Sequence, residues 1–445
     1  MDFLDNLVLP QSAHHMVLLK YLLVLTYILL IPYLSVLLGS LGLSLFFERK
    51  TDKNENYYRF AKELIDQITF NKSVSFALGV VPLISSAFCY AQLLHLTGLN
   101  VSEYILISVL FLIISLILIY TYKYTFHLKD IFTFASRKVG ISDPLPVELP
   151  SYQIKTSSLH KKSGLYGLLF LIVTIYLFIA SIQLAGDSSN WSVKNNLIGL
   201  IFSLKAFVYF LQFIVASFAL TSALILYKYF RADSVSLDDA EYLNMVKNFS
   251  LKLGAVATII LPLLIILNVM VKPQESFSFD VFGYALLALI VVLCIVILFY
   301  VMLKESSSKF ASLLIYLFVV LFAFLIIKDQ YAFDTSTKKQ FAILAANYED
   351  YQKKVKEEFG LVTEVINGAD IYNGKCIACH QFDRKLVGPP YKEVLPKYDG
   401  KKDALVQFVL NPIKVNPEYP PMPNQGLKPK EAEAVVDYLI STYMK

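Results

Sequence analysis

Eight stretches of this sequence are apolar and long enough to cross a lipid bilayer as helices, and they limit the fold more than any other feature. A helix needs about 20 apolar residues to span the hydrocarbon core. Because backbone polar groups find no partner in lipid, such segments are predicted to be helices. The chain is 56% hydrophobic with a mean hydropathy of +0.56, too apolar for a protein that is soluble throughout. The stretches are residues 17–47, 74–96, 101–122, 164–185, 196–228, 251–271, 281–303 and 309–327.

Basic residues alternate between the two sides of these stretches, which predicts how the chain crosses the membrane. The loops after the first, third, fifth and seventh stretches hold six, seven, four and two lysines or arginines, whereas the opposite loops hold only Lys194 and Lys272. Lysine- and arginine-rich loops stay in the cytoplasm, so we expect both termini to face outward from a bacterial cytoplasmic (inner) membrane. The net charge of +5 is then explained by the basic loops that set the membrane topology, and it does not indicate nucleic-acid binding. Residues 1–15 contain no lysine or arginine, so no cleavable signal peptide is predicted.

The apolar part of the chain also reads as an internal duplication. A charged segment followed by a span with glycine and proline occurs twice, first with Gly79 and Pro82 and then with Gly254 and Pro262. The copies are repeat 1, about 16–185, and repeat 2, about 196–328. The alternative is coincidence between segments rich in leucine and isoleucine. A duplication predicts two four-helix bundles side by side.

Close to the end of the chain, Cys376-Ile377-Ala378-Cys379-His380 forms a CxxCH motif. This spacing is the attachment signature of a c-type haem. Two thiols on one helical turn can each form a thioether with a haem vinyl group, and the histidine that follows can offer a nitrogen to the iron. The motif predicts one covalently attached haem c.

A zinc half-site and a redox dithiol are the alternative readings of CxxC. Zinc needs about four ligands, and the other two cysteines, Cys89 and Cys294, lie far away inside apolar stretches, where they read as small core residues. A dithiol of the thioredoxin type needs a βαβ context, which this sequence lacks. Haem attachment therefore explains the motif best.

A second axial ligand for the iron is expected from a methionine, because thioether sulfur suits haem iron. Only Met422 and Met444 lie downstream of the motif. Met422 sits in the rigid segment Tyr-Pro-Pro-Met-Pro, whereas Met444 is one residue from the end, where chains fray. We therefore predict His380 and Met422 as the metal ligands.

The residues around the motif predict a small helical domain. Residues Phe359 to Gly374 read as a helix that the motif closes, and Gly388-Pro389-Pro390 follows as a loop. Pro429 to Tyr443 reads as an amphipathic helix. Its apolar stripe is formed by Ala432, Val435, Val436, Leu439, Ile440 and Tyr443.

In this order of elements, residues 360–445 resemble a small class I cytochrome c. The resemblance covers roughly a fifth of the chain. It implies that His380 and Met422 are the axial ligands of the haem. It also implies that the carbonyl of Pro389 or Pro390 orients the histidine ring.

The predicted fold is all-α: a polytopic membrane protein with eight transmembrane helices, arranged as two four-helix bundles, and a C-terminal periplasmic cytochrome c domain. The predicted domains are residues 1–328 in the membrane, an amphipathic linker helix at 329–360 and the cytochrome c domain at 361–445. The apolar stripe of the linker helix is expected to lie either on the membrane surface or against a partner.

The first 100 residues resemble subunit I of the cytochrome bd oxidase superfamily. The match runs from Tyr27 through Pro32 and includes the run from Asn71 to Val80. The family carries a haem-ligating histidine at the position aligned with Tyr27, and its other haem histidine, in the fifth span, has no counterpart here. No two histidines of this chain are expected to face each other at mid-depth. The resemblance thus implies a retained helix scaffold without b or d haems, and it argues against oxygen reduction by this chain alone.

Lys205 is a charged residue inside the fifth apolar stretch, about ten residues from its start. Such residues are functional candidates by default. One expectation is that Lys205 pairs with a partner subunit or faces a quinone or a proton path. The other is that its side chain extends along the helix to the outer surface.

These features predict a monohaem electron carrier that is one subunit of a larger respiratory complex, bd-like or related. Eight spans exceed what anchoring one domain requires, so other integral membrane subunits are expected partners, together with the lipid bilayer and a periplasmic electron donor or acceptor. One alternative is a catalytic subunit that oxidises quinol or reduces oxygen with shared cofactors. The other is a structural scaffold with a vestigial haem.

Overall fold

We analysed a computed structural model of the chain. It describes residues 10–50, 54–138, 149–191, 196–230, 239–305, 309–359 and 366–443. These residues form helices and no strand. Met444 and the predicted domain boundary near residue 361 lie outside the described residues.

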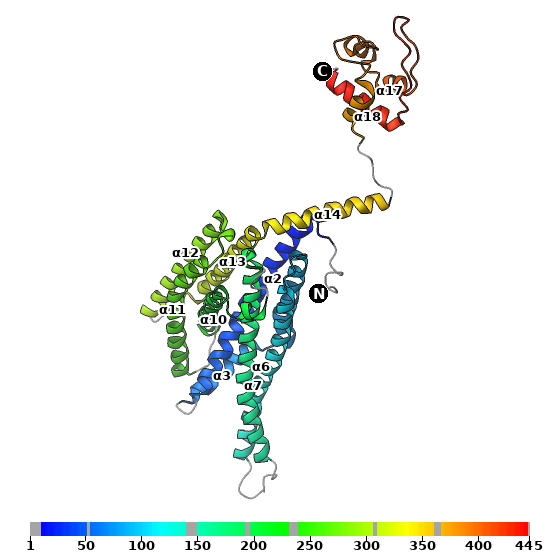
Figure 1. Ribbon diagram of the computed structural model, residues 1–445. Helices are drawn as coiled ribbons and strands as arrows, with labels where there is room; N and C mark the ends of the chain where they lie inside the picture. The colour runs from blue at the N-terminus through cyan, green and yellow to red at the C-terminus, as the bar shows by residue number, and fades with distance from the viewer. Residues whose placement is uncertain are drawn as a thin grey trace. The chain divides into compact units, whose positions relative to one another are not determined.

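The chain divides into two compact units, Met1–Tyr351 and Gln352–Lys445 (Figure 1). The elements of the first unit are α2 (Ala13–Glu48), α3 (Glu55–Ile68), α4 (Lys72–Ser75), η2 (Phe76–Val80), α5 (Val81–Leu93), α6 (Val101–Lys138), α7 (Leu149–Ala185), η3 (Ser188–Asn190), α9 (Leu197–Ile201), α10 (Leu204–Phe230), α11 (Ala240–Met270), η4 (Gln274–Ser276), α12 (Phe279–Lys304) and α13 (Ala311–Ser336), followed by α14 (Lys338–Glu358), which crosses the boundary. Those of the second unit are α15 (Gly368–Ile371), η5 (Tyr372–Cys376), α16 (Tyr391–Val394), η6 (Leu395–Tyr398), α17 (Lys402–Leu410) and α18 (Pro429–Tyr443).

Eight helices of the first unit, among the residues described, are long and apolar enough to cross a membrane. The predicted number of spans is thereby confirmed. The fifth stretch differs from the prediction, because it is divided into the short helix α9 and the long helix α10. The last span is longer than predicted, since α13 continues to Ser336.

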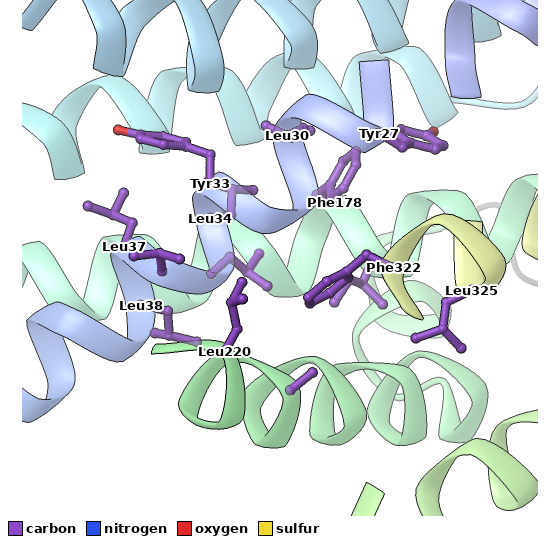
Figure 2. Close-up of a cluster of buried hydrophobic side chains, with 14 of the residues drawn as sticks. Tyr27, Leu30, Tyr33, Leu34, Leu37, Leu38, Phe178, Leu220, Phe322 and Leu325 are labelled. Atoms are coloured by element: carbon purple, nitrogen blue, oxygen red, sulfur yellow. The ribbon is translucent and has the colours of Figure 1, made fainter. Parts of the chain in front are cut away.

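One continuous core joins the helices of the first unit. Its buried side chains come from both halves of the sequence, and α2 is the central helix of this core, packing against α3, α5, α7, α10 and α13. Gly39 permits the close approach of α2 and α10, because a Cβ atom there would lie 2.1 Å from Thr221 Oγ1. Figure 2 shows part of this core, with Leu34, Leu37 and Leu38 of α2 near Leu220 of α10. The predicted bundles therefore share one interior.

Charged side chains tie the helix ends together where α3 lies. Glu48 Oε1 is 2.8 Å from His160 Nε2 and 3.1 Å from Lys129 Nζ. Glu63, on α3, accepts a hydrogen bond of 2.9 Å from the Tyr242 hydroxyl of α11. His160 is fully buried and is the partner of a carboxylate rather than one of a facing histidine pair. Within the described residues, no group of three or more His, Cys, Asp or Glu side chains is arranged to hold a metal ion.

A second set of ion pairs lies at the opposite end of the helices, where α2 begins. Lys205 Nζ is 2.9 Å from Oδ1 of Asp187, whose side chain is buried. Lys205 therefore neutralises a buried carboxylate of its own chain. Asp329 Oδ1 lies 2.9 Å from Lys272 Nζ and 3.2 Å from Lys328 Nζ. Each buried charge here has a partner of opposite sign, as burial requires.

The start of α14 is anchored to the first unit. A bend at Thr337 separates it from α13 (Figure 1). Gln340 Nε2 donates a hydrogen bond of 2.7 Å to the carbonyl oxygen of His95, and Phe341 and Leu344 are buried in the core. The apolar stripe predicted for the linker thus begins as part of the membrane unit.

Candidate functional site

The CxxCH segment lies at the end of a short helical stretch in the second unit. Asn367 caps α15, because its Oδ1 accepts a hydrogen bond of 3.1 Å from the Ala369 amide. The π-helical turn η5 follows, and the His380 amide then donates to the Cys376 carbonyl at 3.0 Å. The helix predicted for Phe359 to Gly374 is therefore shorter: Phe359 follows α14, and the described helix begins at Gly368. The two cysteines and the histidine still share one turn, as the motif requires.

The loop after the motif orients the imidazole of His380. Its Nδ1 is 3.0 Å from the carbonyl oxygen of Pro389. A carbonyl only accepts, so Nδ1 carries the proton and Nε2 keeps its lone pair free for a ligand bond. The amide of Gly388 donates to the Cys379 carbonyl at 2.9 Å, which closes the loop onto the motif. Of the two prolines predicted for this role, Pro390 uses its carbonyl instead to accept from the Glu393 amide at 3.1 Å.

Gly388 is required because nothing larger fits beside the imidazole. A Cβ atom at this position would lie 2.2 Å from Cε1 of His380. We expect Gly388→Ala to displace the ring or the loop, weaken the bond to Pro389, and destabilise the second unit by about 2 kcal/mol. Chemical unfolding of the full chain in detergent, followed by haem absorption, measures this loss.

Gly400→Ala is no suitable control, since Gly400 has a φ of +67° that itself disfavours alanine. Gly374→Ala is suitable, because no atom lies within 4 Å of its Cβ position.

An aromatic stack supports the histidine from the other elements of the unit. The rings of His380 and Tyr391 are stacked with centroids 5.2 Å apart. Tyr443, at the end of α18, stacks on Tyr391 at 5.7 Å and on Phe382 at 4.9 Å. Burial raises the pKa of Tyr391 above its ordinary value. Tyr391 was not among the predicted site residues. Its position directly after Gly-Pro-Pro could have indicated that it lies near the histidine.

A cleft of about 300 Å³ brings the predicted ligands together. Cys376, Cys379, His380 and Met422 all line it, from segments more than 40 residues apart in sequence. Burial raises the pKa of the Cys376 thiol, and the neighbouring Lys375 opposes this effect. Val435 and Leu439 of α18 supply apolar lining. Such a cleft can hold a flat apolar group within reach of thiols, an imidazole and a thioether that line the same space.

Hydrogen bonds fix the loop that carries Met422. Asn424 Nδ2 donates to the carbonyl of Leu410, at the end of α17, at 3.1 Å. Asn424 Oδ1 accepts from the Gly426 amide at 2.8 Å. Lys375 Nζ, beside the motif, donates to the carbonyl of Gln425 at 3.0 Å. The methionine loop is thus tied both to α17 and to the segment that carries the thiols.

The donor set of this cleft fits haem c. Both thiols are free, one imidazole nitrogen is available and a thioether lines the same space. The thiols would hold the group covalently, and His380 and Met422 would be its axial ligands. Cys89 is buried in α5 and Cys294 lies on α12, so both belong to the first unit. The fold and the donor set together define a unit that binds covalent haem.

Comparisons with known proteins agree with this class. The family model for cytochrome c matches residues 365–442. Cytochrome c-551 of Pseudomonas denitrificans is 33% identical over 79 residues, which is 17% of this chain and 95% of that protein. Cytochrome c-552 of Hydrogenobacter thermophilus is 37% identical over 70 residues, 15% of this chain and 70% of that protein. Cytochrome c-551 of Azotobacter vinelandii is 33% identical over 78 residues, 17% of this chain and 95% of that protein.

Through this C-terminal unit, the chain belongs to the cytochrome c family. The family implies haem c and electron transfer. No solved structure matches the chain. The matched residues leave out the membrane unit, so the resemblance of that unit to bd oxidases stays a prediction.

Proposed function

We propose that this protein is a membrane-integrated monohaem c-type cytochrome that passes single electrons within a larger respiratory complex. The observation that carries the proposal is the single cleft lined by two thiols, one imidazole and one thioether. Haem c supplies a one-electron iron couple when bound. His380 and Met422 would hold its iron, and ligation by this pair would raise the potential, which suits the high-potential end of an electron-transfer chain.

The residues of the cleft have separate tasks in this proposal. Cys376 and Cys379 retain the group covalently, so it cannot exchange with solvent. Pro389 holds His380 in one tautomer and one orientation, which lowers the reorganisation needed when the iron changes charge. Val435 and Leu439 of α18 give the cleft an apolar wall against which the flat ring can pack.

The haem unit is proposed to lie on the periplasmic side of a bacterial inner membrane, with both termini on that side. The lysine and arginine distribution and the number of candidate spans together support this location. The lysine and arginine distribution favours a cytoplasmic position for the loops after the odd-numbered spans. An even number of spans then returns the C-terminal unit to the side on which the chain began.

The proposed partners are integral membrane subunits of a bd-like or related complex, and a periplasmic electron donor or acceptor. The support is the size of the membrane unit, since eight candidate spans far exceed the one needed for anchoring. Tyr27, aligned with a haem ligand of the bd superfamily, donates its hydroxyl hydrogen bond to Tyr90 at 2.9 Å. A hydrogen-bonded tyrosine pair, in place of the haem-ligating histidine of that superfamily, fits a subunit that contributes its helices and its haem c to a complex.

Haem content tests the proposal. We expect a pyridine haemochrome spectrum of the purified chain to show one haem c and no stoichiometric b or d haem. Replacing both Cys376 and Cys379 with alanine should abolish covalent attachment. A stoichiometric b or d haem in the chain alone would contradict the carrier function and favour a catalytic subunit. Haem c that cannot be reduced and reoxidised would favour a structural role.

A further inference from the structure

The first unit buries the start of an apolar stripe on α14 and leaves the rest of it increasingly exposed. Phe341 and Leu344, near the start of the helix, are buried in the core. Tyr348 follows half-buried, and Tyr351 is 44% exposed. Each residue of an α-helix is turned by about 100° from the one before it, so steps of three and four residues keep these side chains on one face.

Contacts at its start place α14 at the ends of the spanning helices. It follows directly after α13, the eighth candidate span, and it crosses the ends of the long helices instead of continuing along them (Figure 1). Lys20, close to the start of α2, lies with its Nζ 3.9 Å from the centre of the Phe341 ring. The same Nζ is 3.2 Å from Oδ1 of Asp334, close to the end of α13. The start of α14 is therefore held at the edge of the apolar layer.

Helix periodicity gives the direction of the exposed tyrosines. Phe341 and Leu344 point into the core, which is the side of α14 on which the spanning helices lie. Tyr351 shares their face, about 15 Å farther along the helix axis. Beside this region, Leu18 and Tyr21 of α2 are 61% and 69% exposed, as expected of a surface that faces lipid. The stripe of α14 thus continues from the core toward the layer that surrounds the spans.

The charges of α14 indicate an apolar attachment. Its basic and acidic residues nearly balance and are interspersed. They are Lys338, Lys339, Lys353, Lys354 and Lys356, and Glu349, Asp350, Glu357 and Glu358. Such a surface has little net charge with which to select a charged protein or an anionic headgroup. Tyrosine, in contrast, is enriched where lipid meets water, because it has an apolar ring and a polar hydroxyl.

The second half of α14 needs a cover that the described residues do not provide. After Leu344, none of the described residues of this helix is buried. Helices of about 12–15 residues are marginal in water by themselves, and most gain their stability by burying an apolar face. The part of α14 after Leu344, residues 345–358, is of this length. An environment that accepts its apolar face would stabilise it.

We propose that the second half of α14 lies in the interface of the lipid bilayer, with Tyr348 and Tyr351 between the headgroups and the first part of the acyl chains. Helices bound in this way bury their apolar face by about 5–10 Å. Val355 continues the stripe four residues after Tyr351. The inference rests on the membrane location of the first unit and not on the haem. The segment that leads to the haem unit would then start at the membrane surface.

Tryptophan fluorescence of the full haem-containing chain in vesicles tests the assignment. The chain has one tryptophan, Trp191, which is replaced by phenylalanine in every variant. Tyr348→Trp and Tyr351→Trp then report on the stripe. Ala346→Trp and Glu349→Trp are their matched controls, because each lies two residues earlier and about 200° around the helix.

The vesicles are made of phosphatidylcholine whose acyl chains carry bromine close to the headgroups, bromine close to the bilayer centre, or no bromine. Each variant is compared with itself in lipid without bromine, so that quenching by the haem cancels. We expect bromine close to the headgroups to quench the two stripe variants at least about threefold more than their controls, because the stripe lies in the interface. Bromine at the bilayer centre should quench them less.

Ile290→Trp is the reference for lipid contact, because Ile290 is 48% exposed in the middle of the candidate span α12. We expect it to be quenched most by bromine at the bilayer centre. Equal quenching of the stripe variants and their controls, with Ile290→Trp quenched, would overturn the assignment and leave the proposed membrane-integrated carrier standing. No quenching of Ile290→Trp would contradict the membrane location itself. A stripe shielded from both bromine and aqueous acrylamide would show that another protein or a second copy covers it, which also overturns the assignment.

Amide hydrogen exchange in the same vesicles gives a second readout. Replacing Tyr348 and Tyr351 together with serine should speed exchange in the second half of α14 at least about tenfold, because the interface then gains little apolar area. Replacing Ala346 and Glu349 with serine is the matched control, since it costs at least as much helix propensity on the other face. Equal exchange in the two double variants would contradict the assignment. Elution profile and haem c content identify any variant that fails to fold.

Discussion

Met422→Ala is expected to lower the reduction potential of the haem unit by on the order of 0.1–0.2 V, a fraction of the ~0.8 V range that axial ligands span. The thioether sulfur stabilises the ferrous state relative to a harder ligand, so its removal favours the ferric state. Met422 lines the same cleft as His380, whose imidazole is already held by Pro389. Spectroelectrochemical titration of the full chain measures the change, together with loss of the sulfur-to-iron charge-transfer band.

Met444→Ala is the matched control, because Met444 is the other methionine downstream of the motif. We expect this variant to keep the potential and the charge-transfer band of the unchanged chain. If Met444→Ala lost the band and Met422→Ala kept it, the ligand assignment would be reversed. If Met422→Ala lowered the potential but left the rate of electron flow unchanged, the electron-carrier function would be contradicted.

Gly368→Ala is expected to destabilise the second unit by about 3 kcal/mol, at the upper end of overpacking costs. A Cβ atom at Gly368 would lie 2.0 Å from the carbonyl oxygen of Ala434 and 2.6 Å from its carbonyl carbon. Both are backbone atoms of α18, so no side-chain rotation relieves the clash. The two helices must separate, and the apolar contacts between them are lost. Chemical unfolding followed by haem absorption reports the difference in midpoint.

Gly374→Ala is the control for this prediction too, since nothing lies within 4 Å of its Cβ position. We expect a change of less than about 1 kcal/mol there. A midpoint for Gly368→Ala equal to that of Gly374→Ala would show that α15 and α18 do not pack as described. A lower midpoint for both variants would point instead to a general need for glycine in this segment.

Much of the site could be predicted because the chemistry is local in sequence. Cys376, Cys379 and His380 lie within one helical turn, so their spacing alone identifies covalent haem attachment. The helix from Pro429 to Tyr443 was predicted with the bounds that the structure shows, because a stripe of apolar residues at helical spacing reports which face is buried. Tyr391 was missed, since its contact with the imidazole depends on the path of the loop between them.

Charged residues inside the membrane unit were the least predictable from sequence. Lys205 gave no indication of its partner, and only the structure shows Asp187 beside it, 18 residues earlier in the chain. The same holds for Lys272, in the loop after α11, and Lys328, on α13, which share Asp329. Pairing of this kind depends on how each helix is rotated about its own axis when it packs. The length of an apolar stretch does not specify that rotation.

The sequence by itself determined the number of spans, the motif that predicts haem c and the family of the C-terminal unit. These follow from hydrophobic length and from short motifs, which act over a few neighbouring residues. Tertiary structure decided the rest: that the eight helices share one core around α2, that Pro389 rather than Pro390 holds His380, and that a cavity of about 110 Å³ lies between five helices. These depend on side-chain packing between segments far apart in the chain, which spacing and composition do not encode.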